Sequence, residues 1–233
     1  RRYRACGRNL SIHPASKVIA EMPESIRSWK GVPQAYHYEH PDYPDVKFEG
    51  IFLPSSLGSA AIPFLGRDLS EWMGMYDRLA TFGFMVSDSS YGRVIRVPGL
   101  RHLVRYQLTD HDLDGFYFAI KLIARCFFAV GARRIILPVA NEGNVYTTGE
   151  ELEQRFRRED LQPSLVYAMA FHPLGTCRFS GTPENGVVDR LGRCHYHDNL
   201  YILDGASIPG PLGVNPQVTI MTFSRLAARE LAK

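Results

Sequence analysis

A His-Pro motif near the carboxyl terminus constrains this chain more than any other feature. It reads Phe171-His-Pro-Leu-Gly-Thr-Cys177 and follows an apolar segment. Pro173 disfavours helical backbone angles at the preceding His172, and Gly175 permits a tight reversal of the chain. His172 is therefore predicted to stand at a turn, where its side chain is presented rather than buried.

A second motif, Gly213-Val-Asn-Pro-Gln-Val-Thr219, follows about forty residues later. Asn215 is a favourable N-cap residue, and Pro216 suits the first position of a helix. An apolar stripe then continues to Leu231, so the motif predicts a helix that begins beside Asn215. The first-turn amides of this helix are expected to place partial positive charge next to Asn215.

Four sequence blocks in this order resemble the carboxyl-terminal part of the glucose–methanol–choline (GMC) oxidoreductases. They are the two motifs above and, between them, Gly186-Val-Val-Asp189 and Asn199-Leu-Tyr-Ile-Leu-Asp-Gly-Ala-Ser207. Members of this family are FAD-dependent alcohol oxidases and dehydrogenases. The resemblance implies that the chain takes part in oxidising a primary or secondary alcohol to an aldehyde or ketone, by hydride transfer to the flavin.

The resemblance also implies roles for individual residues. In the family, the His of the His-Pro motif and the Asn (or His) of the second motif bind the alcohol hydroxyl. His172 is thereby implied as the general base and Asn215 as the residue that orients the hydroxyl. Flavin contacts are implied at the end of a strand expected over residues 200–203 and at the start of the last helix. The implied cofactor-binding residues are Asp204, Gly205, Asn215, Pro216 and Gln217.

Each of these assignments has a structural alternative without a role in catalysis. A histidine beside an apolar segment is more often a satisfied structural residue than a catalytic one. Asn215 can serve as an N-cap alone, and Asp204 as a turn former alone. The order of the four blocks favours the catalytic interpretation of His172. A non-catalytic binding or interaction module that retains the fold is the alternative function.

The remaining residues predict an α+β fold, with a mostly antiparallel sheet and helices on one face. This architecture agrees with the substrate domain that the family resemblance implies. Strands are expected on both sides of a His-Pro turn within 6–22, in two halves of 35–54, and at 80–87, 92–97, 103–108 and 133–139. Helices are expected as short pieces within 55–72, from 112 to 130, and from 148 to 157.

Three parts are expected along the chain, which is interpreted as a fragment of a longer protein. Residues 1–14 resemble the family's junction with the FAD-binding domain, and within them His13 is expected to hold backbone groups of a turn. Residues 15–165 are expected to form the substrate-binding domain. Residues 166–233 are expected to carry the catalytic motifs and to complete the FAD domain. Because no Gly-x-Gly-x-x-Gly follows a strand here, the amino-terminal Rossmann part is expected to lie outside these residues.

Charge and composition limit the partners. The 233 residues include 27 basic and 24 acidic residues, interspersed to a net charge of +3, so a nucleic-acid partner is not expected. The apolar run from Ile120 to Val130 is too short for a membrane span and contains Lys121 and Arg125. Four cysteines without paired spacing favour reduced thiols and a cytoplasmic location, although the compartment stays open, and Cys126 is expected in the core.

The expected partner is a small-molecule alcohol, while the electron acceptor (oxygen, a quinone or a cytochrome) is left open. A bulky or apolar alcohol, such as a sterol or long-chain alcohol, is favoured by aromatic residues expected to line a pocket. These are Tyr36, Tyr38, Phe52, Phe82 and Phe84.

Two weaker patterns need mention. Zinc-ligand types occur at Cys177, Cys194, His195 and His197, but without a Cys-x-x-Cys knuckle, so no metal site is expected. Asn9-Leu-Ser11 has the form of a glycosylation acceptor, which has a meaning only in a secreted protein.

Overall fold

The computed structural model describes residues 4–32, 34–140 and 143–233. Its contacts divide the chain into two compact units. The first unit comprises Arg1–His13, Ser87–Thr109 and Ala170–Lys233, and the second comprises Pro14–Val86 and Asp110–Met169. Because the units interleave in sequence, segments far apart along the chain meet in the first unit, and both carboxyl-terminal motifs belong to it.

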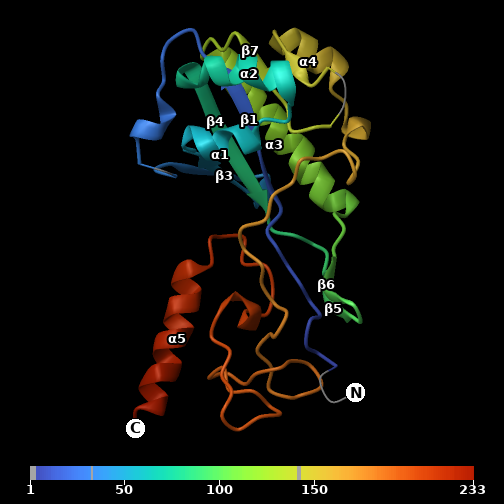
Figure 1. Ribbon diagram of the computed structural model, residues 1–233, viewed down its shortest axis with the longest axis vertical. Coiled ribbons are helices and arrows are strands. Elements are labelled where there is room, and N and C mark those ends of the chain that lie inside the picture. Colours follow the sequence, from blue (N-terminus) through green and yellow to red (C-terminus); the bar gives the residue numbers. More distant parts are fainter. Residues whose placement is uncertain (1–3, 33, 141–142) are drawn as a thin grey trace. The chain divides into compact units, whose positions relative to one another are not determined.

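A six-stranded sheet with strand order β2-β3-β4-β1-β7-β8 forms the second unit (Figure 1). Its strands are β1 (Ala15–Glu21), β2 (His37–His40), β3 (Tyr43–Gly50), β4 (Leu79–Val86), β7 (Arg134–Ile136) and β8 (Val145–Tyr146). Every neighbouring pair in it runs antiparallel. In the central pair, Val18 lies opposite Phe82 and Ile19 opposite Thr81, so alternate residues of β1 and β4 face opposite sides of the sheet.

Helix α3 (Asp110–Ala129) covers one face of this sheet (Figure 1). Phe84 of β4 meets Phe116 of α3 edge to face, with 4.9 Å between the ring centroids. A Cβ atom on Gly115 would lie 3.3 Å from Val46, so glycine at this position allows the helix to approach the strands closely.

The opposite face of the sheet packs against α1 (Ser55–Ala61) and α2 (Gly66–Gly74). Trp72 of α2 belongs to a buried cluster with Ile19, Leu79 and Ile136, which point away from α3. The predicted antiparallel α+β architecture is therefore confirmed, and the structure adds helices on the second face. The central strand β1 is buried along six of its seven residues, as a strand covered on both sides requires.

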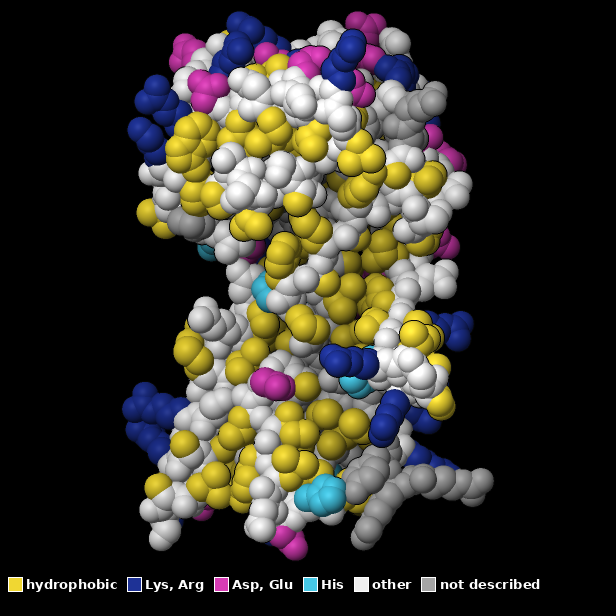
Figure 2. Space-filling view, viewed as in Figure 1, with side chains coloured by type: hydrophobic (Ala, Val, Ile, Leu, Met, Phe, Trp, Pro, Cys, Tyr) yellow, Lys and Arg dark blue, Asp and Glu magenta, His cyan; other side chains and the backbone are white. Residues whose placement is uncertain are grey.

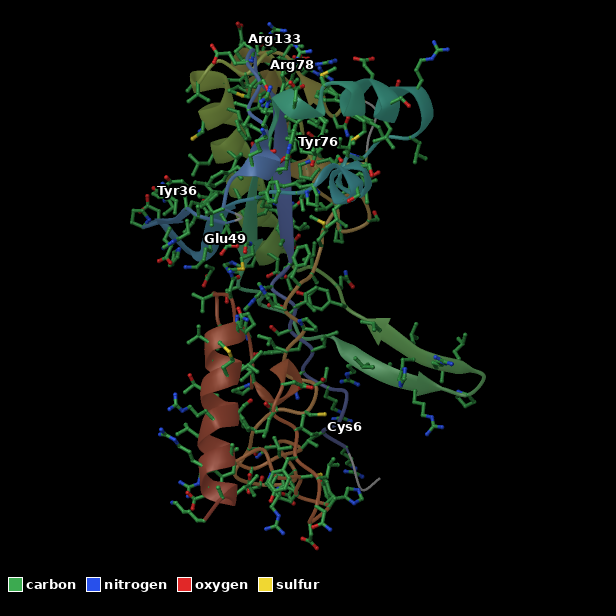
Figure 3. All side chains as sticks on the ribbon, turned by 60° about the vertical axis from the view of Figure 1, so that its left-hand side comes forward. Cys6, Tyr36, Glu49, Tyr76, Arg78 and Arg133 are labelled. Atoms are coloured by element: carbon green, nitrogen blue, oxygen red, sulfur yellow. The ribbon has the colours of Figure 1, made fainter. Side chains whose placement is uncertain are left out.

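The other regular elements, apart from α5, are short. In the second unit, α4 (Gly149–Arg155) is capped by Thr148, whose side chain accepts from the amide of Glu151. In the first unit, β5 (Arg93–Val97) and β6 (Leu100–Arg105) form a hairpin that extends away from the rest of that unit (Figure 3). Single 3-10 turns occur at Ser28–Lys30, Tyr76–Arg78, Arg158–Asp160 and Gly205–Ser207.

Helix α5 (Gln217–Leu231) runs beside the irregular segment that precedes it (Figures 1 and 3). Phe223 packs on Phe179 with ring centroids 5.0 Å apart, and Ser224 Oγ donates to the Leu203 carbonyl at 2.8 Å. The strand expected over residues 200–203 is not formed, and a single bridge joins Arg193 and Tyr201. The backbone groups of residues 200–203 bond instead to the adjacent loop and to the side chain of Ser224 in α5.

Charged side chains of both signs intermingle over the part of the second unit that carries α2 and α4 (Figure 2). This agrees with the interspersed charges of the sequence and gives no uniformly basic surface in this view. Among the helices in the described ranges, none combines the length and apolar character needed to cross a bilayer.

Candidate functional site

The His-Pro motif forms a tight turn in the first unit. Leu174 and Ser11 exchange two backbone hydrogen bonds, at 2.8 and 3.1 Å. Gly175 then turns the chain with a φ of +83°, a conformation that glycine adopts without strain. His172 stands just before this reversal, at the turn that its proline and glycine neighbours predict, but its side chain is half-buried.

A buried carboxylate anchors the segment that pairs with this turn. Asp88 is 3% exposed and accepts hydrogen bonds from Ser11 Oγ at 2.9 Å and Tyr106 Oη at 3.0 Å. It also accepts from the backbone amides of Ile12 at 2.9 Å and His13 at 3.1 Å. Four bonds to one carboxylate satisfy its oxygens without a cation and fix the backbone up to His13.

His13 lies between the two predicted catalytic motifs. Its ring is almost completely buried, with 1% of the residue exposed. Nε2 accepts from the backbone amides of Leu212 at 2.9 Å and Gly213 at 3.2 Å. On the other side of the ring, Nδ1 is 3.4 Å from Nδ1 of His172. The expectation that His13 holds backbone groups is confirmed, and these groups belong to the loop that leads to Asn215.

Burial disfavours the protonated form of both imidazoles. Burial lowers the pKa of His13 to about 4, against an opposing effect of Asp88 and with a smaller lowering by His172. Burial also lowers the pKa of His172. A neutral His172 retains one unprotonated ring nitrogen, which is a requirement for any role as a proton acceptor.

Asn215 is exposed at the end of the loop that His13 holds. The structure corrects its predicted place in the helix, because Pro216 occupies the cap position with a φ of −83° and a ψ of −3°. The Pro216 carbonyl accepts the first helical hydrogen bond, from Ile220, so α5 begins at Gln217. The first-turn amides of a helix have no acceptor within the helix itself. This donor set fits a group that carries negative charge.

The Asp-Gly segment packs directly against the His-Pro turn. The Gly205 carbonyl accepts from the amide of Gly175 at 3.2 Å, and a Cβ atom on Gly205 would lie 2.8 Å from the Pro173 carbonyl oxygen. The exposed Asp204 side chain accepts from the amide of Ala206 at 2.8 Å and caps the short turn there. The blocks noted in the sequence are thus neighbours in space, with Asp204 serving as a turn former.

Gly175 provides a test of this packing. Alanine there would combine a left-handed backbone with overlap of its Cβ atom on the Asn9 carbonyl oxygen. We expect Gly175→Ala to lower the free energy of unfolding in urea by about 3 kcal/mol. Gly99→Ala is the matched control, because Gly99 has a φ of +81° with nothing within 4 Å of the added atom. Its free energy of unfolding is expected to fall by about 1 kcal/mol. Equal decreases in the two variants would contradict the role of close packing.

Two cysteines meet at the far end of the His-Pro motif. Cys6 Sγ and Cys177 Sγ are 3.9 Å apart (Cys6 is labelled in Figure 3). The hydrogen bond from Cys177 lowers the pKa of Cys6 to about 6, while burial opposes this change. The same contact, together with burial, raises the pKa of Cys177. Cys6 is therefore the thiolate of the pair at pH 7.

Alkylation should reveal this thiolate. We expect iodoacetamide to modify the exposed Cys6 with a half-maximal rate near pH 6, slower below that pH as the thiol becomes protonated. Cys177→Ala removes the donor and should slow the reaction at pH 7 by roughly tenfold. Peptide mass spectrometry separates Cys6 from the exposed Cys126, which serves as the internal reference. A Cys6 rate that rises only in alkaline solution would refute the assignment.

The other cysteine predictions have mixed outcomes. Cys126 was expected in the core but is exposed on α3, because the apolar run around it is longer than the buried stripe of the helix. Cys194 is buried in an apolar cluster with Val187 and Val188, and His195 Nε2 lies 3.0 Å from the Ser180 carbonyl oxygen. Within the described residues, no group of three or more His, Cys, Asp or Glu side chains is arranged to hold a metal ion.

The aromatic residues expected to line one substrate pocket do not converge. Phe84 is buried in the core against α3, and Tyr36 is 79% exposed at the edge of the sheet (Figure 3). Tyr38 and Phe82 line an apolar groove of about 480 Å³ beside α3, whereas Phe52 lines a separate hollow. The strand alternation that places Phe82 and Phe84 on the α3 face explains this correction.

Asp88 was missed from the sequence, and His13 was not assigned to the site. The acid follows β4 and carries no motif of its own, so only the fold reveals its four bonds. His13 gave a usable signal, since its His-Pro pair repeats the pattern at His172. Its partners are about 160 and 200 residues away, a separation that local patterns do not encode.

Comparison with known proteins identifies relatives of this chain. A family profile described as GMC oxidoreductase matches residues 98–224. A GMC-type oxidoreductase of Mycobacterium tuberculosis is 30% identical over 223 residues, which cover 95% of this chain and 35% of the relative. Long-chain-alcohol oxidase FAO1 of Arabidopsis thaliana is 25% identical over 253 residues, covering 97% of this chain and 32% of the relative.

Solved structures share the fold. Pyridoxine 4-oxidase from Mesorbium loti superimposes with a TM-score of 0.69 at 17% identity, over 98% of this chain and 44% of that protein. A formate oxidase gives 0.69 at 14% identity, over 97% and 47%. The chain thus spans about a third of the curated relatives named above and less than half of either solved structure. Because the profile covers more than half of its residues, the chain belongs to the GMC oxidoreductases, a family of FAD-dependent enzymes.

Proposed function

We propose that this chain forms part of an FAD-dependent enzyme that oxidises an alcohol to an aldehyde or ketone. One observation carries the proposal: the His-Pro turn and the loop before Asn215 contact the same buried imidazole, that of His13. If His172 were only structural, there would be no reason for His13 to contact both its ring and the loop before Asn215. Two polar side chains supported by one ring are suited to bind a single substrate oxygen.

The residues present fit the flavin at one end of the site. Asn215, Pro216 and Gln217 lie at the start of α5, where the first-turn amides of the helix provide donors for negative charge. Asp204 and Gly205 are assigned to the same cofactor, because Gly205 packs on the His-Pro turn and Asp204 directly precedes Gly205. Bound FAD would supply the hydride acceptor.

His172 and Asn215 act on the hydroxyl group in this proposal. His172 is the general base, a role supported by its burial, which lowers its pKa and so favours the neutral form that can accept a proton. Asn215 orients the hydroxyl, because an amide donates a hydrogen bond without competing for the proton. Both residues hold the oxygen so that the carbinol carbon faces the hydride acceptor.

A long-chain alcohol is the substrate class favoured by the relatives. FAO1 of Arabidopsis thaliana and other similar proteins from that plant are named long-chain-alcohol oxidases. The structural neighbours named pyridoxine 4-oxidase and formate oxidase share the fold alone. We therefore assign the chain to an enzyme for apolar alcohols.

The test is anaerobic reduction of the flavin in the complete protein. We expect a flavin absorbance spectrum, bleaching on addition of hexadecanol, and formation of the matching aldehyde. Hexadecane is the matched control, because it lacks the hydroxyl that His172 and Asn215 bind. Protein that has no flavin and takes up none from added FAD would support a non-catalytic binding module and contradict the proposed enzyme.

A further inference from the structure

The hydrogen on the His13 ring has a determined position. Its Nε2 accepts from two backbone amides, Leu212 and Gly213. An amide can only donate, so Nε2 must present its lone pair to both. A neutral imidazole carries one hydrogen, which therefore lies on Nδ1 of His13.

This Nδ1 hydrogen points at the second imidazole. Nδ1 of His13 and Nδ1 of His172 are 3.4 Å apart, and the rings meet edge to face at 74°. Two ring nitrogens attract each other only if one donates and the other accepts. Because His13 must donate, His172 must accept at Nδ1, and its own hydrogen then lies on Nε2.

We propose that His13 is a positioning residue that fixes this tautomer of His172, so that His172 meets the alcohol oxygen as a hydrogen-bond donor through Nε2 and accepts the hydroxyl proton there only after a change of tautomer. The inference rests on the proposed function for the identity of the oxygen. It deepens that function, because donation by Nε2 and proton acceptance by Nε2 exclude each other while His13 is in place. His13 thereby sets the fraction of molecules in which His172 can accept the hydroxyl proton.

The surroundings of His13 hold it in this position. Its backbone has a φ of +47°, a left-handed conformation that a residue other than glycine adopts only where the surroundings impose it. The Asp88 carboxylate supplies that constraint by accepting from the His13 amide. Burial lowers the pKa of His13 to about 4, so the ring keeps a single hydrogen throughout the neutral range.

Nuclear magnetic resonance of isotope-labelled histidine nitrogens reads the tautomer directly, without any alcohol. At pH 7.5 we expect the complete protein to show Nδ1 of His172 as an unprotonated acceptor and Nε2 as a protonated nitrogen. A His172→Gln variant identifies the signals by their loss. A wild-type spectrum with the His172 hydrogen on Nδ1 would overturn the proposal.

Two substitutions at His13 extend the test. His13→Phe keeps a ring but removes both nitrogens, so the two His172 nitrogen signals should move towards an average of the two tautomers. His13→Gln retains an acceptor for the backbone amides and a donor for His172, and should restore the wild-type pattern. A folded His13→Phe protein with an unchanged His172 spectrum would contradict the positioning role. Failure of alcohol oxidation in the complete protein, by contrast, would reject the proposed function and leave the tautomer result intact.

Discussion

Replacement of His172 by alanine is expected to slow alcohol-dependent flavin reduction in the complete protein by roughly 10²–10⁴-fold. The side chain is half-buried at a turn, and Nδ1 of its ring lies 3.4 Å from Nδ1 of His13. Its removal should therefore eliminate the group that binds the hydroxyl without breaking the backbone bonds of the turn. Single-turnover mixing without oxygen measures the rate of the reductive step alone.

The His172 prediction has a matched control in the same unit. His102 lies exposed on strand β6 of the hairpin, and His102→Ala should leave the reduction rate unchanged. The flavin absorbance of both variants should equal that of the wild-type protein. If His172→Ala instead loses its flavin while His102→Ala keeps it, then His172 is structural. If His172→Ala reduces its flavin at the wild-type rate, the catalytic assignment is incorrect.

Asp88→Ala is expected to destabilise the protein more than any other single substitution considered above. The carboxylate is buried and accepts four hydrogen bonds, from Ser11, Ile12, His13 and Tyr106. Alanine would leave buried donors without their acceptor, at a cost of about 3–5 kcal/mol in the free energy of unfolding. The same change removes the acceptor of the His13 backbone amide. The two His172 nitrogen signals should therefore also move towards an average of the two tautomers.

Urea unfolding measures the Asp88 effect, and Asp198→Ala provides its control. Asp198 pairs with Arg193 at 2.9 Å, but its side chain is 93% exposed. An exposed pair of this kind should change the free energy of unfolding by no more than about 0.5 kcal/mol. A similarly small change in Asp88→Ala would show that the buried carboxylate does not anchor the His13 segment.

Strands and helices with strong local signals were predictable from the sequence. The apolar stripe after Pro216 gave the extent of α5, and Thr148 gave the start of α4. The alternating halves of 35–54 became β2 and β3. The segment 200–203 failed because its backbone groups bond to a loop and to Ser224, partners that no strand pattern contains.

Only the residues of the candidate site that lie in sequence motifs were predictable. His172, Asn215 and the Asp204-Gly205 pair each had a recognisable sequence context, and the fold brings the last of these against the His-Pro turn. Asp88 and the bridging role of His13 depend on contacts across more than seventy residues. The expected aromatic pocket was incorrect because side-chain direction on β4 follows sheet packing, which sends Phe84 into the core.

Isotopic substitution at the carbinol carbon tests the central proposal most directly. The complete protein should be mixed without oxygen with hexadecanol or with hexadecanol that carries two deuterium atoms at its first carbon. If the alcohol gives its hydride to the flavin at the His172 and Asn215 site, the deuterated alcohol should bleach the flavin several-fold more slowly and yield deuterated aldehyde. A bound flavin that stays oxidised with both alcohols would contradict the account.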